Sequence, residues 1–441
     1  MTAVVDQPPA RLAKAILRIG SLAAAGWGAL AVCLALLAAL LLPGYAALGV
    51  GAALLVLAAV PVWRFHRIAP PASATVPLTG EGLSELNLIV RQISSALGVP
   101  TPAAMELSPD CDAWLEPRTG GPVLVIGTPF LWWLRVSELR GLLAPVIAGL
   151  EAAHDPAVVR ARRVVRRLDV AEDRGCAPWP RRAVATVAGA CRGRAEGMER
   201  VIAAQASQRA RIVEPAGRVY AHEQVGLVAA AWDRLLTRLA HPAWAAGYAP
   251  STLNAALVAA LVELGERDRV GVGLADRLSE RPACDLLDEP GEVDRAVSAV
   301  VPLVYRGEGA RRPLEWADYT RLVAEPSLRA AAAAAPDHPL VSKTRALLLA
   351  PAPAPGGARP PATGHEHVDG GDGELPAGLR AVLQCGLVDL GHAAFAVDWL
   401  DGVVLRDRAA LTVPVDEIVH ALIDSADFAP LRDWLSYAAR L

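Results

Sequence analysis

The side chains best suited to metal binding are spread along this chain without the spacing of a metal site. The nine histidines are His66, His154, His222, His241, His338, His365, His367, His392 and His420. Two histidines at i and i+4 on a helix bind zinc, and a glutamate between them acts as general base. No pair here has that H-E-x-x-H spacing or its inverse. His365-Glu366-His367 lies in a Pro/Gly-rich stretch, where ordering the chain around a metal would cost backbone entropy, and we interpret it as solvated linker.

Motifs for nucleotide, nucleophilic and disulfide chemistry are also missing. Gly271-Val272-Gly273 lacks the preceding strand and the third glycine of a dinucleotide site, and no G-x-S-x-G or Walker A loop occurs. Six cysteines are scattered without a C-x-x-C pair, which indicates unreactive thiols rather than a disulfide framework. A net charge of -3 provides no basic footprint, so nucleic acid is not an expected partner.

Three polar clusters allow more than one interpretation. His154-Asp155 is typical of a helix-end cap, with a remnant of metal-site support as the alternative. His222-Glu223 is typical of the polar face of a helix. A basic helix contains Arg160, Arg162, Arg163, Arg166 and Arg167. It is either a solvated face or a patch attracted to anionic lipid at a cytoplasmic leaflet.

Two apolar segments near the N-terminus predict a transmembrane hairpin. Ile19 to Leu42 is uncharged and would form a helix of roughly 36 Å, and Tyr45 to Trp63 would return over roughly 28 Å. The outer ends carry Arg11, Lys14, Arg18, Arg64 and Arg67, whereas the turn carries no charge. The positive-inside rule therefore predicts a multi-pass protein of the cell membrane, with both termini and the soluble part in the cytoplasm. A cleaved signal peptide is the alternative, but it has a shorter apolar core and no second span.

The whole chain is expected to be an α+β protein, predominantly α. The expected parts are a membrane anchor over 1–68, a linker over 69–82, a main domain over 83–350, a disordered Pro/Gly linker over 351–376 and a small C-terminal α/β module over 377–441. Apolar spacing predicts helices at 83–97, from Ser137, at 251–264 and at 294–304. The expected strands are 104–107, 122–126, 395–400 and 403–413, with turns at Gly120-Gly121 and Asp401-Gly402.

The order of motifs from Leu86 to Leu150 is similar to that of the HtpX-like membrane zinc metallopeptidases, a gluzincin family. A helix before "GVPTP" is followed by "ELSPDCDAW", by "PVLVIGTPFLWWL" and by "SELRGLLAPVIAGLEAAHD" from Ser137 to Asp155. In the family, the last segment matches a helix that carries His-Glu-x-x-His. The resemblance, which extends to Val219, implies a membrane-anchored endopeptidase fold of the kind that serves membrane protein quality control.

The resemblance places the family's catalytic positions at Pro145, Val146 and Gly149. Proline has no metal-binding atom, valine accepts no proton and glycine has no side chain, and Pro145 is also expected to disturb the helix. The family's third ligand matches Glu214 in "QRARIVEPAGRVYAHEQVG", where Gly217-Arg218 replaces the family's Ala-Asp. Because one carboxylate binds zinc only weakly, no cofactor is expected, although the parent family uses zinc.

These features support three hypotheses. The first is a catalytically inactive pseudopeptidase in the lipid bilayer that binds an extended polypeptide or a membrane protein. The resemblance implies that the strand residues Val123, Leu124, Val125 and Ile126 would pair with the bound peptide. The second hypothesis is an active zinc endopeptidase in which His154 and His222 converge on Glu214. The third is a structural subunit of a membrane complex, for which the groove beside Gly149 should be filled.

Overall fold

The structure divides into two compact units. It is a computed structural model that describes residues 8–41, 44–68, 73–78, 84–118, 120–174, 181–267, 280–307, 309–350 and 373–440. One unit comprises Met1–Val225 and Arg281–Glu289, and the other comprises Gly226–Glu280 and Pro290–Leu441. The described residues are predominantly helical with small sheets, which confirms the predicted balance of helix and strand.

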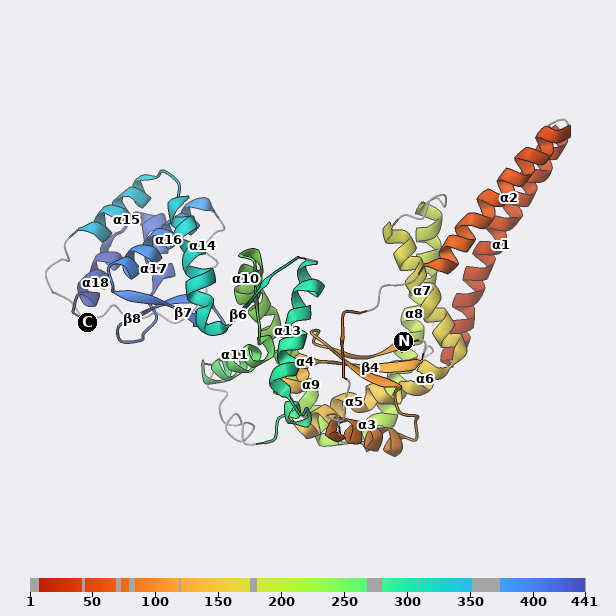
Figure 1. Cartoon of the computed structure of the whole chain (residues 1–441), viewed down its shortest axis with the longest axis horizontal. Helices are drawn as coiled ribbons and strands as arrows, with labels where there is room; N and C mark the ends of the chain where they lie inside the picture. The colour runs from red at the N-terminus through yellow and green to blue at the C-terminus, as the bar shows by residue number, and fades with distance from the viewer. Residues whose placement is uncertain are drawn as a thin grey trace. The chain divides into compact units, whose positions relative to one another are not determined.

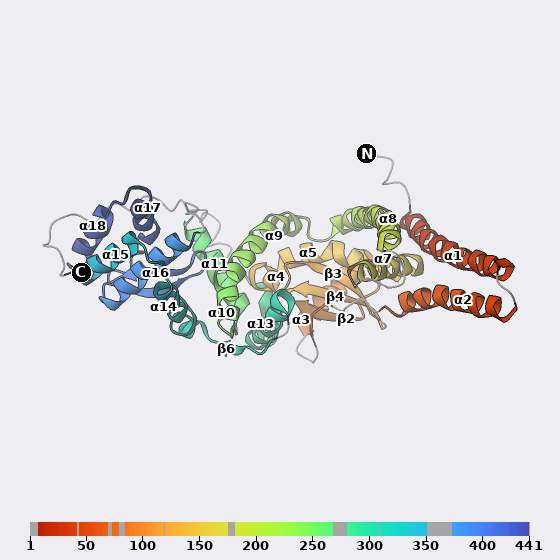
Figure 2. The same ribbon diagram turned by 90° about the horizontal axis from the view of Figure 1, so that it is seen from above.

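Two long helices, α1 (Pro9–Leu41) and α2 (Gly44–Arg67), run side by side as a hairpin (Figures 1 and 2). Both are long and apolar enough to cross a membrane. Their large apolar side chains face outward, with Leu40 83% and Tyr45 93% exposed. Such a continuous apolar surface suits contact with lipid rather than water. The pair therefore agrees in length and composition with the predicted transmembrane segments.

A further apolar segment belongs to the soluble core. Val136–His154 and Pro156–Asp173 together are also long and apolar enough to cross a membrane, but the two helices are bent by 96° relative to each other. Leu139, Leu143 and Ile147 in the first half are fully buried within the protein. This segment is hydrophobic because it packs inside the first unit.

The first turns of α1 also belong to that core. Ala13 and Ile16 are fully buried in one apolar cluster with residues of α7 (Pro156–Arg174) and α8 (Arg181–Arg209). The cluster includes Val158, Ala161, Cys191 and Met198, and Phe65 of α2 packs against it. Helix α1 thus continues without a break from the protein core into the exposed apolar hairpin.

The first unit contains a four-stranded sheet in the order β1-β2-β4-β3. The strands are β1 (Val76–Pro77), β2 (Ala104–Ser108), β3 (Ala113–Arg118) and β4 (Gly121–Gly127). β2 and β4 confirm the strands predicted at 104–107 and 122–126, and they pair in parallel. β3 was not predicted, and it runs antiparallel to β4 beyond a turn in which Gly121 has a φ of +124°.

The position of β4 corrects the predicted peptide-binding strand. Val123, Leu124, Val125 and Ile126 are buried and pair with β2 on one side and with β3 on the other. The backbone groups of an interior strand already have partners, so β4 offers no edge to an added strand. β3 ends the strand order, and among the described residues no further strand lies beside it.

Short helices surround the sheet. They are α3 (Ser84–Leu97), α4 (Thr128–Trp133), α5 (Val136–Ala148), α6 (Leu150–His154), the 3-10 turns Ala210–Ile212 and Ala283–Leu286, and the first part of α9 (Pro215–Leu235). α3 buries Leu86, Ile89, Val90 and Ile93, as its spacing predicts. The expected disturbance at Pro145 is small, because α5 continues through it to Ala148. A proline in the last turn removes only one helical hydrogen bond.

The second unit is mostly helical after α9. Its described α-helices are α10 (His241–Ala245), α11 (Leu253–Arg267), α13 (Pro290–Arg306), α14 (Glu325–Ala333), α15 (Pro339–Leu349), α16 (Glu374–Asp389), α17 (Val415–Ser425) and α18 (Ala429–Ala438). It also contains π-helical turns at Leu236–Ala240 and Thr320–Ala324 and a 3-10 turn at Trp316–Asp318. β5 (Tyr248–Pro250) pairs in parallel with β6 (Arg312–Leu314). β7 (Ala393–Asp398) and β8 (Gly402–Asp407) form the predicted hairpin, although β8 ends before the expected Val413.

The core of the C-terminal module extends upstream of its expected boundary at 377. Val341 and Leu348 on α15 share one buried cluster with Leu383, Leu405 and Trp434. The apolar face that precedes the Pro/Gly-rich stretch therefore completes this core. α16 begins at Glu374, inside the linker expected over 351–376, while residues 351–372 lie outside the described part of the chain.

Candidate functional site

A groove of about 540 Å³ opens in the first unit. Its walls are strand β3, helix α5 with the following Gly149, and helices α7 and α8, which are labelled in Figure 2. The lining residues are Ala113, Trp114, Leu115, Pro145, Val146, Gly149, Arg162, Val165, Arg166, Ala195, Glu199, Ile202, Ala203 and Ala206. Most of them are apolar, and all belong to one compact unit.

The α5 face of the groove carries Pro145, Val146 and Gly149. Positions i and i+4 of a helix lie on one side, and α5 presents this side to the groove. A Cβ atom added at Gly149 would lie 3.7 Å from Cδ1 of Leu115, so β3 passes close to this position. None of the three side chains has a lone pair or an acidic proton. This face therefore cannot coordinate a metal ion or transfer a proton.

The α7 and α8 wall holds the charged side chains of the groove. Arg162 pairs with both carboxylate oxygens of Glu199, at 2.7 Å from Nε and 2.6 Å from Nη2. Such bidentate geometry orients both side chains and joins α7 to α8. Arg166, one turn further along α7, is exposed and has no ion pair among the described residues. The wall therefore offers one satisfied ion pair and one available cation.

Strand β3 is the end strand of the sheet among the described residues, and part of it lines the groove. Ala113, Trp114 and Leu115 line the groove, while β4 occupies the other edge of the strand. An exposed edge presents unpaired N–H and C=O groups, which pair readily with another extended chain. The groove thus combines an apolar lining with backbone donors and acceptors.

Glu214, the acidic position implied by the resemblance, does not line the groove. It precedes α9 with a φ of +38°, and its Oε1 lies 3.2 Å from Nε of Arg140 on α5. Close backbone packing explains this placement, because a Cβ at Gly217 would lie 2.4 Å from the carbonyl oxygen of Ser137. The start of α9 packs on the backbone of α5, and the carboxylate of Glu214 forms an ion pair with Arg140.

The two candidate histidines lie elsewhere. Nδ1 of His154, the last residue of α6, is 2.7 Å from the carbonyl oxygen of Leu150, and His222 is exposed on α9. Over the ranges that the structure describes, no three His, Cys, Asp or Glu side chains are placed to hold a metal ion. His154 and His222 therefore do not form a metal-binding group with Glu214. His365-Glu366-His367 and Gly271-Val272-Gly273 lie outside the described residues.

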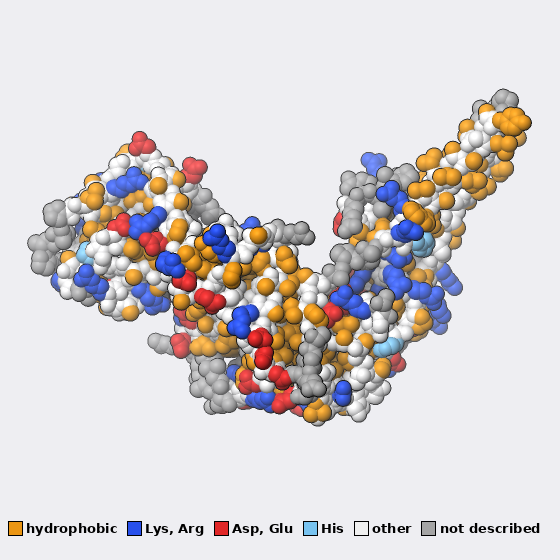
Figure 3. Space-filling model, viewed as in Figure 1, with side chains coloured by type: hydrophobic (Ala, Val, Ile, Leu, Met, Phe, Trp, Pro, Cys, Tyr) orange, Lys and Arg blue, Asp and Glu red, His pale blue; other side chains and the backbone are white. Residues whose placement is uncertain are grey.

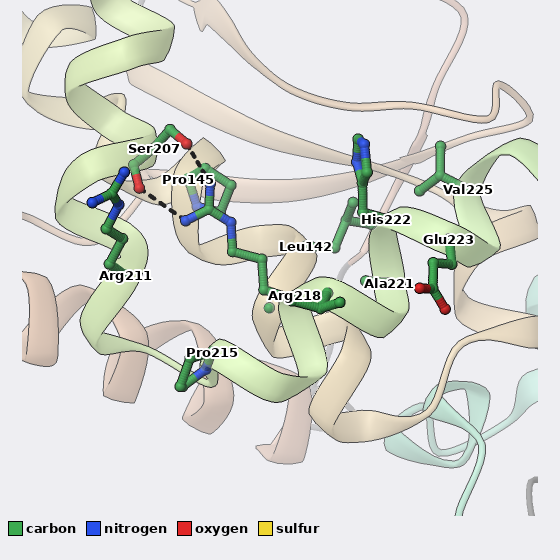
Figure 4. A pocket seen from close by; sticks show the side chains of 12 residues that line it. Leu142, Pro145, Ser207, Arg211, Pro215, Arg218, Ala221, His222, Glu223 and Val225 are labelled. Carbon is green, nitrogen blue, oxygen red and sulfur yellow. Dashed lines mark hydrogen bonds between the residues drawn. The ribbon is translucent and has the colours of Figure 1, made fainter.

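A second pocket of about 840 Å³ lies between α5, α8 and α9 (Figure 4). Arg218 reaches from α9 to Ser207 on α8 and donates to its carbonyl oxygen, at 2.8 Å, and to its hydroxyl. His222 and Glu223 lie farther along α9, and Pro145 lines this pocket as well as the groove. Arg218 thus joins two helices.

Two half-buried cysteines of the first unit, Cys111 and Cys284, are poor nucleophiles. Burial, together with Asp110 and Asp112, raises the pKa of Cys111 to about 12. Burial, and then the charge of Asp285, raises the pKa of Cys284 to about 11. Both thiols are therefore protonated at neutral pH, and the thiolate is the reactive form.

Two features of the groove were missed by sequence reasoning. The Gly120-Gly121 turn lies just before the predicted strand at 122–126, and such a turn signals a hairpin. It could therefore have indicated a strand before the turn, where β3 lies. The Arg162–Glu199 pair joins residues separated by 37 positions on two helices, so no local pattern reveals it.

Comparison with known proteins gave no family model, no curated protein and no solved structure that matches this chain.

Proposed function

We propose that this chain is a membrane-anchored protein that binds an extended polypeptide in the groove beside β3 and does not cleave it. One observation carries the proposal: an open strand edge adjoins a groove in which Pro145, Val146 and Gly149 supply no reactive group. An extended segment gains affinity by pairing its backbone with such an edge, and alternate side chains can enter the neighbouring groove.

The dimensions and lining of the groove define the segment that fits it. β3 has six residues, and at about 3.3 Å per residue it can pair with a segment of similar length. Val165, Ile202 and Ala203 favour apolar side chains on that segment. Arg166 favours an acidic residue near one end, because opposite charges across an interface guide the register of binding.

The similarity to HtpX-like metallopeptidases supports the same proposal. We assign the groove to the position of their substrate cleft, with Pro145, Val146 and Gly149 in place of the two histidines and the glutamate. Hydrolysis by that chemistry needs a Lewis acid and a general base, and this face of α5 supplies neither. Binding would persist after the reaction was lost.

The open groove favours binding over a purely structural role. A subunit that only packs against others would be expected to fill the space beside Gly149 with its own side chains. Instead, about 540 Å³ remains between β3, α5, α7 and α8. That volume lies in the range of pockets that receive ligands.

The charges around the hairpin support a cytoplasmic soluble part. Cations precede the exposed part of α1 and follow that of α2, whereas the turn between the helices is uncharged. The proposed polypeptide partner is therefore cytoplasmic, or a cytoplasmic segment of another membrane protein.

Binding of fluorescein-labelled β-casein, an unfolded polypeptide, tests the proposal. The full chain in lipid nanodiscs is titrated into the label while fluorescence anisotropy is followed, with and without EDTA. We expect saturable binding, no casein fragments and no effect of EDTA. Chelator-sensitive cleavage would contradict the absence of catalysis, and a lack of binding would contradict the polypeptide-binding role.

Two neighbouring alanines on α8 provide a matched pair of variants. Ala203 is exposed and lines the groove, whereas Ala204 is exposed and does not. Ala203→Trp would fill the groove and is expected to weaken casein binding by about tenfold or more, equivalent to about 1.4 kcal/mol. Ala204→Trp should leave binding unchanged. Equal effects of both substitutions would place the binding site elsewhere.

A further inference from the structure

Several contacts place α7 beside the part of α1 and α2 that adjoins the core of the first unit. A Cβ atom added at Gly20 of α1 would lie 3.6 Å from Cγ1 of Val164. Nε of Arg167 donates to the carbonyl oxygen of Ile68, just beyond α2, at 3.1 Å. Phe65 of α2 packs against the cluster that contains Val158. The middle of α7 therefore lies beside the base of both hairpin helices.

The arginines of α7 fall on two faces. Arg162 and Arg166 line the groove. Arg160, Arg163 and Arg167 follow one another at i, i+3 and i+7, so they share a different face. Since Arg167 on this face contacts the residue after α2, the face adjoins the hairpin. The basic helix of the sequence thus divides into a groove side and a hairpin side.

Positive charge on the hairpin side has few acidic partners in the part of the chain that the structure describes. Residues 8–68 contain five cations and no Asp or Glu. Arg64 and Arg163 are exposed, and neither has an ion pair among the described residues. Burial, and then the charge of Arg163, lowers the pKa of Arg167, which reflects this crowding. Blue side chains gather at this end of the hairpin in Figure 3.

The exposed surface changes from basic to apolar at the same height. Leu22 is 70% exposed, only a few residues beyond Arg18 on α1. On α2, Trp63 is 56% exposed, and the guanidinium of Arg67 lies 4.4 Å from the centroid of its ring. Tryptophan beside a basic residue is typical of the boundary between hydrocarbon and headgroups. Such a boundary is typical of a span at the level where it meets the lipid headgroups.

We propose that an anchor foot, formed by Arg18, Arg64, Arg67, Arg163 and Arg167, binds anionic phospholipid headgroups of the leaflet that faces the soluble part. Guanidinium groups form strong hydrogen bonds with phosphate oxygens, and basic residues at this level are attracted to an anionic leaflet. None of the five lines the groove, so this site is independent of polypeptide binding.

Native mass spectrometry of the full chain in detergent tests the anchor foot. The chain is titrated with phosphatidylglycerol, and with phosphatidylcholine as the neutral comparison, to obtain the affinity for the first bound lipid. We expect a preference for phosphatidylglycerol that falls about fivefold for each charge removed in Arg64→Gln/Arg163→Gln. Arg64→Lys/Arg163→Lys retains the charge and should retain most of the preference.

A control variant removes two charges from the C-terminal part of α8, which does not belong to the anchor foot. A Cβ at Gly197 would lie 3.8 Å from Cδ1 of Leu12, near the start of α1, and Arg200 and Arg209 lie beyond this point. Arg200→Gln/Arg209→Gln should leave the lipid preference unchanged. Equal affinity of the natural chain for both lipids, or equal losses in both glutamine variants, would overturn the proposal. If the Arg64/Arg163 glutamine variant fails to fold, a preference of the natural chain that persists at high salt would overturn it.

Discussion

Arginines in two regions of the molecule have opposite electrostatic surroundings. In the second unit, Arg267 on α11 pairs with Glu263, Asp398 and Asp401. At the anchor foot, Arg64 and Arg163 have no such pairs among the described residues. A cation enclosed by carboxylates of its own chain stabilises the fold, whereas an uncompensated cation remains available to an external anion. The number of acidic partners thus separates structural arginines from those that can recognise a ligand.

Removing Arg267 is expected to have the largest effect on stability. The side chain of Asp398 is only 3% exposed and would lose the cation that compensates its charge. Arg267→Ala should therefore lower the free energy of unfolding by about 2–3 kcal/mol. Arg163→Ala, at an exposed site without an ion pair, should change it by less than about 0.5 kcal/mol. Urea unfolding of the full chain in detergent, followed by tryptophan fluorescence, measures both, and similar losses would break the comparison.

The stability of the β7–β8 hairpin should depend on pH through Asp398. Burial raises its pKa, but the backbone N–H groups of Asp401 and Leu400 and the charge of Arg267 outweigh burial and hold the pKa below its ordinary value of 3.8. Because the pKa in the folded state is depressed, ionised Asp398 contributes its full stabilisation above pH 3.8, and this is lost as the pH falls through the folded value.

Asp398→Asn removes this titration. Amide hydrogen exchange of β7 and β8 in the full chain is compared between the variant and the natural chain at each pH. We expect the natural hairpin to be better protected at neutral pH and the difference to narrow below pH 3.8. A difference that stays constant over this range would show that the charge of Asp398 does not stabilise the hairpin.

The Arg162–Glu199 pair in the groove wall should contribute less to stability than the pairs of Arg267. It has good bidentate geometry, but its side chains are 22% and 45% exposed, so water screens the attraction. Arg162→Ala is expected to lower the free energy of unfolding by less than about 1 kcal/mol. The same urea experiment measures this loss, with Arg162→Lys as the charge-preserving variant. A loss as large as that from Arg267→Ala would show that the stabilisation depends on the presence of acidic partners and not on their burial.

The elements with strong local patterns could be predicted from the sequence. α3 follows from the helical spacing of Leu86, Ile89, Val90 and Ile93, and α1 and α2 follow from their uncharged lengths. The β7–β8 hairpin follows from Asp401-Gly402, because Gly402 adopts a φ of +88° that glycine reaches without strain. In each case, the information lies within a few turns or within one hairpin.

Features that depend on distant partners were not predictable in the same way. The buried residues of β4 indicate a strand, but whether that strand is interior or at an edge depends on β2 and β3. Likewise, the groove position of Pro145 and Gly149 agrees with helical spacing, whereas the pairing of Glu214 with Arg140 results from the packing of α9 on α5. The residues on this face of α5 could be predicted from the sequence, but the groove beside them could not.

Helix α1 joins the exposed apolar hairpin to the core of the first unit without a break. It is one helix of 33 residues, about 50 Å long, and its first turns are buried in the core. Because the helix is continuous between its buried first turns and its exposed part, it resists bending there. Val165 in the groove wall directly follows Val164, the neighbour of Gly20, so α7 contacts the hairpin and also lines the groove. A displacement of the hairpin relative to the first unit would therefore also displace a helix of the groove wall.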